Sequence, residues 1–336
     1  VGVVNDVLSK PDAFDVINEE HDITRERRKK RKVSARDLES ARKNRYKLKS
    51  NPAVPKHRGQ TITGKTKIKD IKDYIDWSPF AMTWGMKPKD LQTQAGRDLL
   101  KDAKKMIELL EDKIDINYSF AIDRCKKSGD DLIVDRNGKS VTYNFLRQSS
   151  NRSRPNLCLT DFVNNKDWIG SFAVWVDGID SRADMLRMAN DDYRSIMIQA
   201  LGDRFAEATA EWLHETVRKK WWGYSEDESL SNEDLIKERY LGIRPAPGYP
   251  ACPDHTEKST LFELLEVSKN LKVKLTESFA MSPASSVSGL YFSHPDASYF
   301  GVGKINKDQV ADYANRKGVT IEEIEKWLGP NLSYSP

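Results

Sequence analysis

The sequence predicts an α+β fold: a single large domain with a mainly antiparallel sheet and several helices, preceded by a charged helical arm. Segments rich in β-branched and aromatic residues alternate with segments of helical periodicity, but without a regular βαβ order. With 336 residues, 38% of them hydrophobic, the chain can bury a sizeable core. Its first 50 residues are heavily charged. We therefore assign residues 1–50 to an arm or linker and residues 51–336 to the domain.

Helical periodicity is clearest in two segments. Apolar residues recur at helical spacing over 99–110, and a longer stripe runs through about 191–220. We expect the longer stripe to be buried through Tyr193, Ile196, Met197, Ala200, Leu201, Phe205, Ala208 and Trp212. Capping-box patterns predict three further helix starts, at Ser231, Thr260 and Thr320.

Several segments favour strands. DLIVD and KSVTYN flank the turn residues Asn137 and Gly138, which predicts a hairpin over 131–144. A further strand is predicted at 169–176, and LTESFAM, SGLYFSH and YFGVGKI have the aromatic content of strands. Residues 51–66 show no apolar periodicity and contain repeated prolines and glycines. We expect a loop there, with the folded part beginning near Lys67.

Charge and composition argue against several classes of protein. Lys and Arg number 55 against 51 Asp and Glu, so a net charge of +4 gives no global basic field for nucleic acid. The run RERRKKRK at 25–32 is expected to be a solvated face, with an interaction module working through it as the alternative. No apolar stretch approaches the roughly 20 residues of a membrane span, and no signal peptide is recognisable. We expect a cytoplasmic protein.

Neither a metal site nor a catalytic residue is predicted. The three cysteines lie far apart without a CxxC pair, which fits a reducing compartment, and Cys252 with His255 would be only half of a metal site. His214 lacks a second histidine four residues on, and Gly301 and Gly303 lack the third glycine of a dinucleotide-binding loop. Because the chain begins with Val1, we expect that it was cut from a longer protein.

The most informative segment is RPAPGYPACPDHTEK, from Arg244 to Lys258. Its closely spaced prolines forbid a helix and hold the backbone extended, which leaves amides and carbonyls free for a ligand or for other partners. Gly248 admits close approach by another group. At the start of the segment, the planar guanidinium of Arg244 is suited to a carboxylate. A rigid structural loop is the alternative interpretation.

Several blocks of the sequence resemble the C-terminal activation domain of cobalamin-dependent methionine synthases. They are GIRPAPGYPACPDHTEK, LTESFAM, SGLYFSHPDASYFGVGKI, EKWLGPNLSY, YIDWSPFAMTW and DRFAEATAEWLHETVRKKWWGY, which together run from about Lys67 to Tyr334. The blocks are long and unusual, so the resemblance is specific. It implies that residues 1 to about 50 join this domain to a preceding cobalamin-binding domain.

The resemblance implies a module that binds S-adenosylmethionine and gives its methyl group to cobalamin in the inactive cob(II)alamin state. A flavodoxin-type partner would supply the electron, and the cobalamin would be held by a domain absent from this chain. The family's ligand contacts fall on six positions of this sequence: Asp76, Glu207, Arg244, Ala246, Tyr299 and Phe300. The fragment is not expected to make methionine alone.

The ligand's chemistry suits these residue types. We expect Arg244, aided by the Tyr299 hydroxyl, to pair with the ligand's carboxylate. We expect Asp76 and Glu207 to attract its positively charged ammonium and sulfonium. Backbone groups around Ala246 would meet the adenine edge. Without the resemblance, Glu207 would be a solvated charge, Asp76 a turn cap and Phe300 core packing. A stand-alone S-adenosylmethionine-dependent methyltransferase is the alternative enzyme function.

Overall fold

The domain is built on an antiparallel sheet whose longest strand is β2 (Ile116–Ser128). The computed structural model describes residues 18–19, 35–49, 51, 53–136 and 138–336, and the basic run at 25–32 lies outside them. In this described part the strand order is β4-β3-β2-β5-β8, and β1 and β3 pair with the two halves of one edge of β2. The remaining strands are β1 (Ile62–Thr66), β3 (Asp131–Arg136), β4 (Lys139–Asn144), β5 (Asp167–Val176), β8 (Ser286–Tyr291) and a separate pair, β6 (Lys274–Leu275) with β7 (Met281–Ser282).

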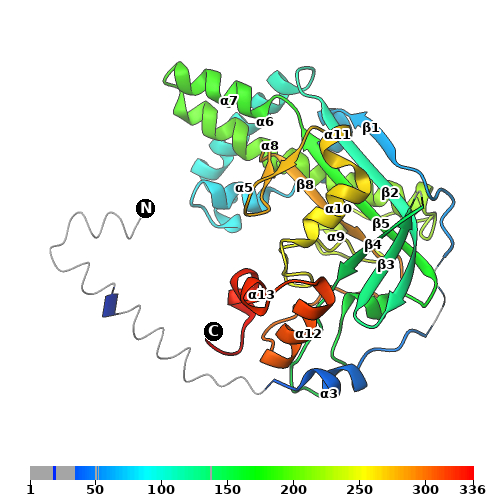
Figure 1. Ribbon diagram of the computed structural model, residues 1–336. Helices are drawn as coiled ribbons and strands as arrows, with labels where there is room; N and C mark the ends of the chain where they lie inside the picture. The colour runs from blue at the N-terminus through cyan, green and yellow to red at the C-terminus, as the bar shows by residue number, and fades with distance from the viewer. Residues whose placement is uncertain (1–17, 20–34, 50, 52, 137) are drawn as a thin grey trace.

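Helices cover both faces of this sheet (Figure 1). The helices are α3 (Leu38–Lys43), α4 (Ile68–Ile71), α5 (Trp77–Thr83), α6 (Gln94–Leu110), α7 (Ile179–Met188), α8 (Asp192–Thr216), α9 (Asn232–Ile236), α10 (Glu257–Leu265), α11 (Val267–Asn270), α12 (Lys307–Lys317) and α13 (Ile321–Leu328). Shorter turns are η1 (Lys72–Tyr74), η2 (Pro88–Gln92), η3 (Leu159–Phe162), η5 (Gly329–Asn331) and a π-helical turn, η4 (Val217–Trp221), directly after α8. Over the described residues, none of these helices combines the length and apolarity needed to cross a membrane.

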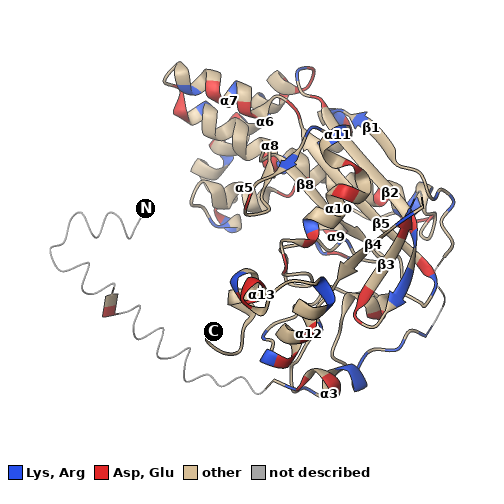
Figure 2. Cartoon of the chain, viewed as in Figure 1, with Lys and Arg blue, Asp and Glu red and all other residues tan. Residues whose placement is uncertain are grey.

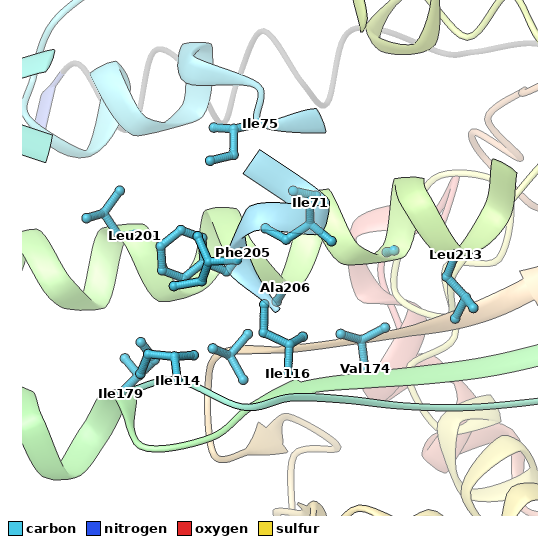
Figure 3. Packing of buried hydrophobic residues seen from close by; sticks show 14 of the residues in the cluster. Ile71, Ile75, Ile114, Ile116, Val174, Ile179, Leu201, Phe205, Ala206 and Leu213 are labelled. Atoms are coloured by element: carbon cyan, nitrogen blue, oxygen red, sulfur yellow. The ribbon is translucent and has the colours of Figure 1, made fainter. Parts of the chain in front are cut away.

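The core on one sheet face is organised around α8. Figure 3 shows Phe205 and Leu201 of α8 between Ile71 and Ile75 on one side and the sheet, with Ile116 and Val174, on the other. Each fully buried Leu, Ile or Phe side chain contributes about 1.5–3 kcal/mol. Because α8 is covered on two sides, its position relative to the sheet is strongly fixed.

The opposite face of the sheet is covered by α10 and by the proline-rich segment. Successive residues of β5 alternate between the faces: Phe172 and Val174 pack toward α8, whereas Ala173 packs toward α10. A third, smaller cluster joins α12 and α13 to Val302 and Ile305. The proline-rich segment is therefore tied to the sheet rather than held away from it.

Helix α3, which belongs to the predicted arm, contacts the domain through ion pairs. Arg42 donates to Asp130 at 2.8 Å and to both carboxylate oxygens of Asp312 at 2.8 and 3.0 Å. Asp130 also accepts from Arg147, which in turn forms two hydrogen bonds with Asp161, at 2.6 and 2.9 Å. The expectation that the folded part begins near Lys67 is thus wrong, because contacts with the domain begin in the arm. The linker role of residues 1–50 stays a prediction.

The structure confirms the α+β class and the elements with strong local signals. The hairpin becomes β3 and β4, the strand predicted at 169–176 becomes β5, and the stripe predicted at 191–220 becomes α8. Helices begin after Ser231 and Thr320 as predicted, and each of these two side chains accepts a hydrogen bond from a backbone N–H of its helix's first turn.

Several predictions from local pattern are wrong. LTESFAM is mostly the turn between β6 and β7 rather than a strand, because residues 276–280 hydrogen bond with one another. Part of the expected loop at 51–66 is strand β1, in which Gly64 lies opposite Tyr118 and its missing side chain makes room for the tyrosine ring. Thr260 lies inside α10, whose N-cap is Thr256. YFGVGKI forms no named strand, because its apolar residues Val302 and Ile305 pack into the α12 and α13 cluster instead.

The predicted stripe on α8 is also too long at its start. Tyr193 and Ile196 are each 45% exposed, because the first turn of α8 extends past the sheet. Tyr193 instead packs against Trp84 and donates to Asp102.

Figure 2 shows acidic and basic residues interspersed over the described helices and loops, with the middle of the sheet largely uncharged.

Replacing Arg147 by methionine tests how far the domain depends on its buried ion cluster. Arg147, Asp130 and Asp161 are each at most 3% exposed in their side chains, so the variant leaves two buried carboxylates with less countercharge. We expect the free energy of unfolding to fall by about 3–5 kcal/mol in urea titrations. Arg187→Met is the control, because Arg187 pairs with Asp184 on the surface and its loss should cost less than about 1 kcal/mol. Equal effects would contradict this account.

Candidate functional site

Two adjoining cavities lie where the proline-rich segment passes between α8 and β8. Their volumes are about 550 Å³ and about 390 Å³, and both are lined by Glu207, Glu238, Arg244 and Tyr249. Small-molecule sites commonly measure about 300–1,000 Å³. The larger cavity is also walled by Phe172 of β5, residues 245–247 and 250–251, Lys258, Met281, residues 286–288, Tyr299 and Phe300.

The six residues predicted to form a site all line these cavities. The larger cavity contains Glu207, Arg244, Ala246, Tyr299 and Phe300, and the smaller one contains Asp76, Glu207 and Arg244. These residues come from four distant parts of the chain: the start of α5, the middle of α8, the proline-rich segment, and the segment after β8. The fold therefore brings them together, and their binding of a ligand stays a prediction.

The proline-rich segment is anchored at both ends by backbone hydrogen bonds. Ile243 pairs with Phe292, the carbonyl of Pro245 accepts from Leu290, and the carbonyl of Pro250 accepts from Val302. The segment is thus rigid, but the predicted extended backbone is confirmed only for residues 244–246. Hydrogen-bonded turns follow over 246–252, and the last two residues, Glu257 and Lys258, already belong to α10. Both interpretations of it are compatible with this geometry, because a fixed loop is also a suitable cavity wall.

Arg244 is held at its backbone and at its side chain. Its backbone N–H donates to the Tyr299 hydroxyl at 2.8 Å, and the Tyr299 and Tyr240 hydroxyls lie 3.0 Å apart. Its guanidinium Nη1 lies 3.0 Å from a carboxylate oxygen of Glu211, and the side chain is 16% exposed. Burial opposes the charge of Arg244, but Glu211 and the surrounding tyrosines outweigh burial and raise its pKa well above the ordinary value. The guanidinium is therefore a fixed positive charge at the cavity.

Besides Glu211, three carboxylates line the cavities in different ways. Asp76 caps α5 by accepting from the Ser78 N–H at 2.8 Å, so it serves as a cap while also lining the smaller cavity. The carboxylates of Glu207 and Glu238 make no hydrogen bond or ion pair with any other described residue. Burial raises the pKa of the Glu238 carboxyl above its ordinary value, and the opposing effect of Arg244 is smaller. The cavities thus combine the fixed charge of Arg244 and two further basic side chains, Arg204 and Lys258, with carboxylates available to a cationic group.

Ala246 and Phe300 contribute shape rather than charge. The Ala246 carbonyl accepts from the Tyr249 N–H at 3.1 Å, which closes a turn. Phe300 is half-buried, with its ring centre 6.2 Å from that of Phe162, and it packs against two of the hydrophobic clusters. Phe300 is therefore core packing and cavity wall at once.

Sequence reasoning missed other residues at the cavities, chiefly Glu211, Glu238 and Tyr249. Glu211 lies four residues after Glu207 on α8, so helical spacing alone would have placed both on one face. Glu238 has no such signal, because it follows the end of α9 with a left-handed φ of 54°. Tyr249 is 60% exposed at the rim.

Comparison with known proteins agrees with this geometry. The family described as vitamin B12 dependent methionine synthase, activation domain, matches residues 67–318. A solved structure, described as a crystal structure of the MetH reactivation domain bound to AdoHcy, is similar to this chain, with a TM-score of 0.85 and 45% sequence identity. The match covers 90% of this chain and 99% of that one.

The fold and cavities define an α+β domain with a charged small-molecule site at the edge of its sheet. The chain belongs to the activation-domain family of vitamin B12-dependent methionine synthases. It is thus a fragment of a cobalamin-dependent methyltransferase, and the resemblance found in its motifs is confirmed.

Gly248 offers a test of how closely the proline-rich segment is packed. Its φ is +95°, and a Cβ added there would collide with the His255 ring. We expect Gly248→Ala to lower the free energy of unfolding by more than about 1–3 kcal/mol, the ordinary cost of such a strained backbone. Gly303→Ala is the control, because Gly303 has a φ of +73° but nothing within 4 Å of an added Cβ. If both variants lose the same stability in urea titrations, the His255 contact does not matter.

Proposed function

We propose that this chain binds S-adenosylmethionine in the two adjoining cavities and presents its methyl group to cobalamin in the cob(II)alamin state. The observation that carries the proposal is the meeting of the fixed Arg244 guanidinium with Asp76, Glu207 and Glu238 at these cavities. S-adenosylmethionine has a carboxylate that can pair with the guanidinium. It also has two cationic groups, the ammonium and the sulfonium, that the three acidic side chains can attract. The similar MetH structure holds AdoHcy, which is what S-adenosylmethionine becomes when its methyl group leaves.

The ligand's groups have distinct partners in this proposal. Arg244, whose neighbour Tyr299 supports it, pairs with the carboxylate. Asp76, Glu207 and Glu238 lie around the ammonium and sulfonium and attract them electrostatically. The backbone near Ala246 meets the adenine edge, while Phe300 supplies an apolar wall.

The chain's part in the chemistry is to hold the methyl donor in one orientation at an open rim. A cobalamin held on its own domain would supply the acceptor for the methyl group, with one electron from a reductant, and the cavity residues of this chain would keep hold of AdoHcy. Fixed charges around the sulfonium orient the donor without moving during the reaction. No separate catalytic base is needed, because the transfer removes no proton from the acceptor.

Other parts of the protein complete this function. We propose that residues 1–50 connect the domain, taken as 51–336, to a cobalamin-binding domain of the same protein, and that a flavodoxin-type protein supplies the electron. The protein would work in the cytoplasm. The methyl acceptor distinguishes this proposal from a stand-alone methyltransferase, which would consume S-adenosylmethionine with a small acceptor and no cobalamin.

Calorimetric titration with S-adenosylmethionine tests the proposal. The wild-type chain should bind, and Arg244→Ala should bind at least about tenfold more weakly, because a charge-assisted pair with the carboxylate is lost. Arg187→Ala, on the surface of α7, should bind like the wild type. No binding by the wild-type chain would refute the proposed function, and equal binding by Arg244→Ala would refute the role of that residue.

The pH dependence of binding tests Glu238. Its carboxylate attracts the cationic ligand only when ionised, so the attraction is present above its raised pKa and is lost as the pH falls through that pKa. Affinity should therefore fall as the pH is lowered from about 8 to about 5, and it should fall less steeply in Glu238→Gln. The ligand's own titration is common to both proteins and cancels in the comparison. Identical slopes in calorimetry would exclude Glu238 from the site.

A further inference from the structure

The ion pair between Arg244 and Glu211 is one end of a row of buried charges. The other carboxylate oxygen of Glu211 lies 3.9 Å from Nη1 of Arg218, and Arg218 donates to Glu228 at 2.6 and 2.9 Å. Side-chain exposure is 16% for Arg244, 12% for Glu211, 0% for Arg218 and 5% for Glu228. The charges alternate in sign, so each has a neighbour of opposite charge.

The row is fixed by α8 and the π-helical turn after it. Glu211 lies on α8 and Arg218 on η4, seven residues on, so both face the same side of one continuous helical segment. Glu228 comes from the loop after η4, and Arg244 from the proline-rich segment. The row of charges thus connects the proline-rich wall of the cavities to α8, the helix that is packed on two sides in the core.

Arg218 also supports the backbone end of Arg244. Its guanidinium carbon lies 4.3 Å from the centre of the Tyr240 ring, an arrangement typical of cation–π contacts. The Tyr240 hydroxyl contacts that of Tyr299, which accepts from the Arg244 N–H. Both ends of Arg244 are therefore held by groups in contact with Arg218.

Glu211 separates two buried arginines that would otherwise repel each other. One of its oxygens forms the ion pair with Arg244 at 3.0 Å; the other makes no hydrogen bond within the described residues and lies 3.9 Å from Arg218. Without the Glu211 charge, the cheapest relief for the Arg244 guanidinium is to turn toward solvent. In that orientation it no longer faces a ligand's carboxylate.

We propose that Glu211 is a positioning residue, which fixes the guanidinium of Arg244 for the ligand's carboxylate and is itself held by Arg218 and Glu228. The inference rests on the proposed function, because it assumes a ligand that carries a carboxylate. It differs from a direct role in which Glu211 binds the ligand's ammonium. The two roles predict different responses to a ligand that lacks only the carboxylate.

The test compares S-adenosylmethionine with decarboxylated S-adenosylmethionine, which keeps the ammonium and the sulfonium. In calorimetry, Glu211→Gln should weaken binding of the first about tenfold, or about 1.4 kcal/mol, and binding of the second by less than about twofold. In the Arg244→Ala background, Glu211→Gln should add no further loss. Glu215→Gln, one turn further along α8, is the matched control and should bind both ligands as the wild type does.

Each other outcome has a definite meaning. Equal losses for the two ligands, or no loss for either, overturn the positioning role. A full second loss in the Arg244→Ala background overturns it as well, because the two residues then act independently. Failure of the wild-type chain to bind either ligand is instead a failure of the proposed function.

A second variant covers the case in which Glu211→Gln does not fold, as judged by circular dichroism. Glu228→Gln leaves Glu211 in place but removes the stronger partner of Arg218, so Glu211 is drawn toward Arg218 and away from Arg244. We expect it to weaken binding of S-adenosylmethionine more than binding of the decarboxylated ligand. Equal effects on both ligands overturn the proposal here too.

Discussion

The burial of α8 between two layers is the constraint on which the rest of this structure depends. One side of the helix packs on the sheet through Phe205 and its neighbours, and the other is covered by Ile71 and Ile75. A helix held in this way cannot rotate without exposing apolar surface. Glu207 and Glu211, on the face left at the cavities, are therefore presented to the site at fixed positions.

The charges at the site gain their effect from this rigidity. Arg244 belongs to the proline-rich segment, in which the carbonyls of Pro245 and Pro250 accept from β8 and from Val302, and its guanidinium pairs with Glu211 of the helix. Fixed charges in a partly buried cavity act on a ligand more strongly than solvated ones, because little solvent screens them and little reorganisation follows binding.

The sequence predicts those parts of the molecule whose signals are local. The hairpin, β5, α8 and the extended start of the proline-rich segment, residues 244–246, follow from turn residues, periodicity and proline spacing. By contrast, β1 depends on the packing of Tyr118 over Gly64. These two residues are about 50 positions apart in the sequence, so no local pattern predicts their contact. The long strand β2 is not predicted at all, because its middle is buried on both faces and lacks a period of two.

The site divides in the same way. Its six predicted residues come from the family resemblance, and the fold places all of them on two adjoining cavities. The positions of Glu238 and of the row of charges through Arg218 depend on tertiary contacts, so the sequence gives no direct sign of them.

The most direct test of the central claim mixes this chain with the cobalamin-binding domain holding cob(II)alamin, an electron donor and methyl-labelled S-adenosylmethionine. The account predicts that the label moves to cobalamin only when this chain is present; label that stays on the bound ligand would contradict it.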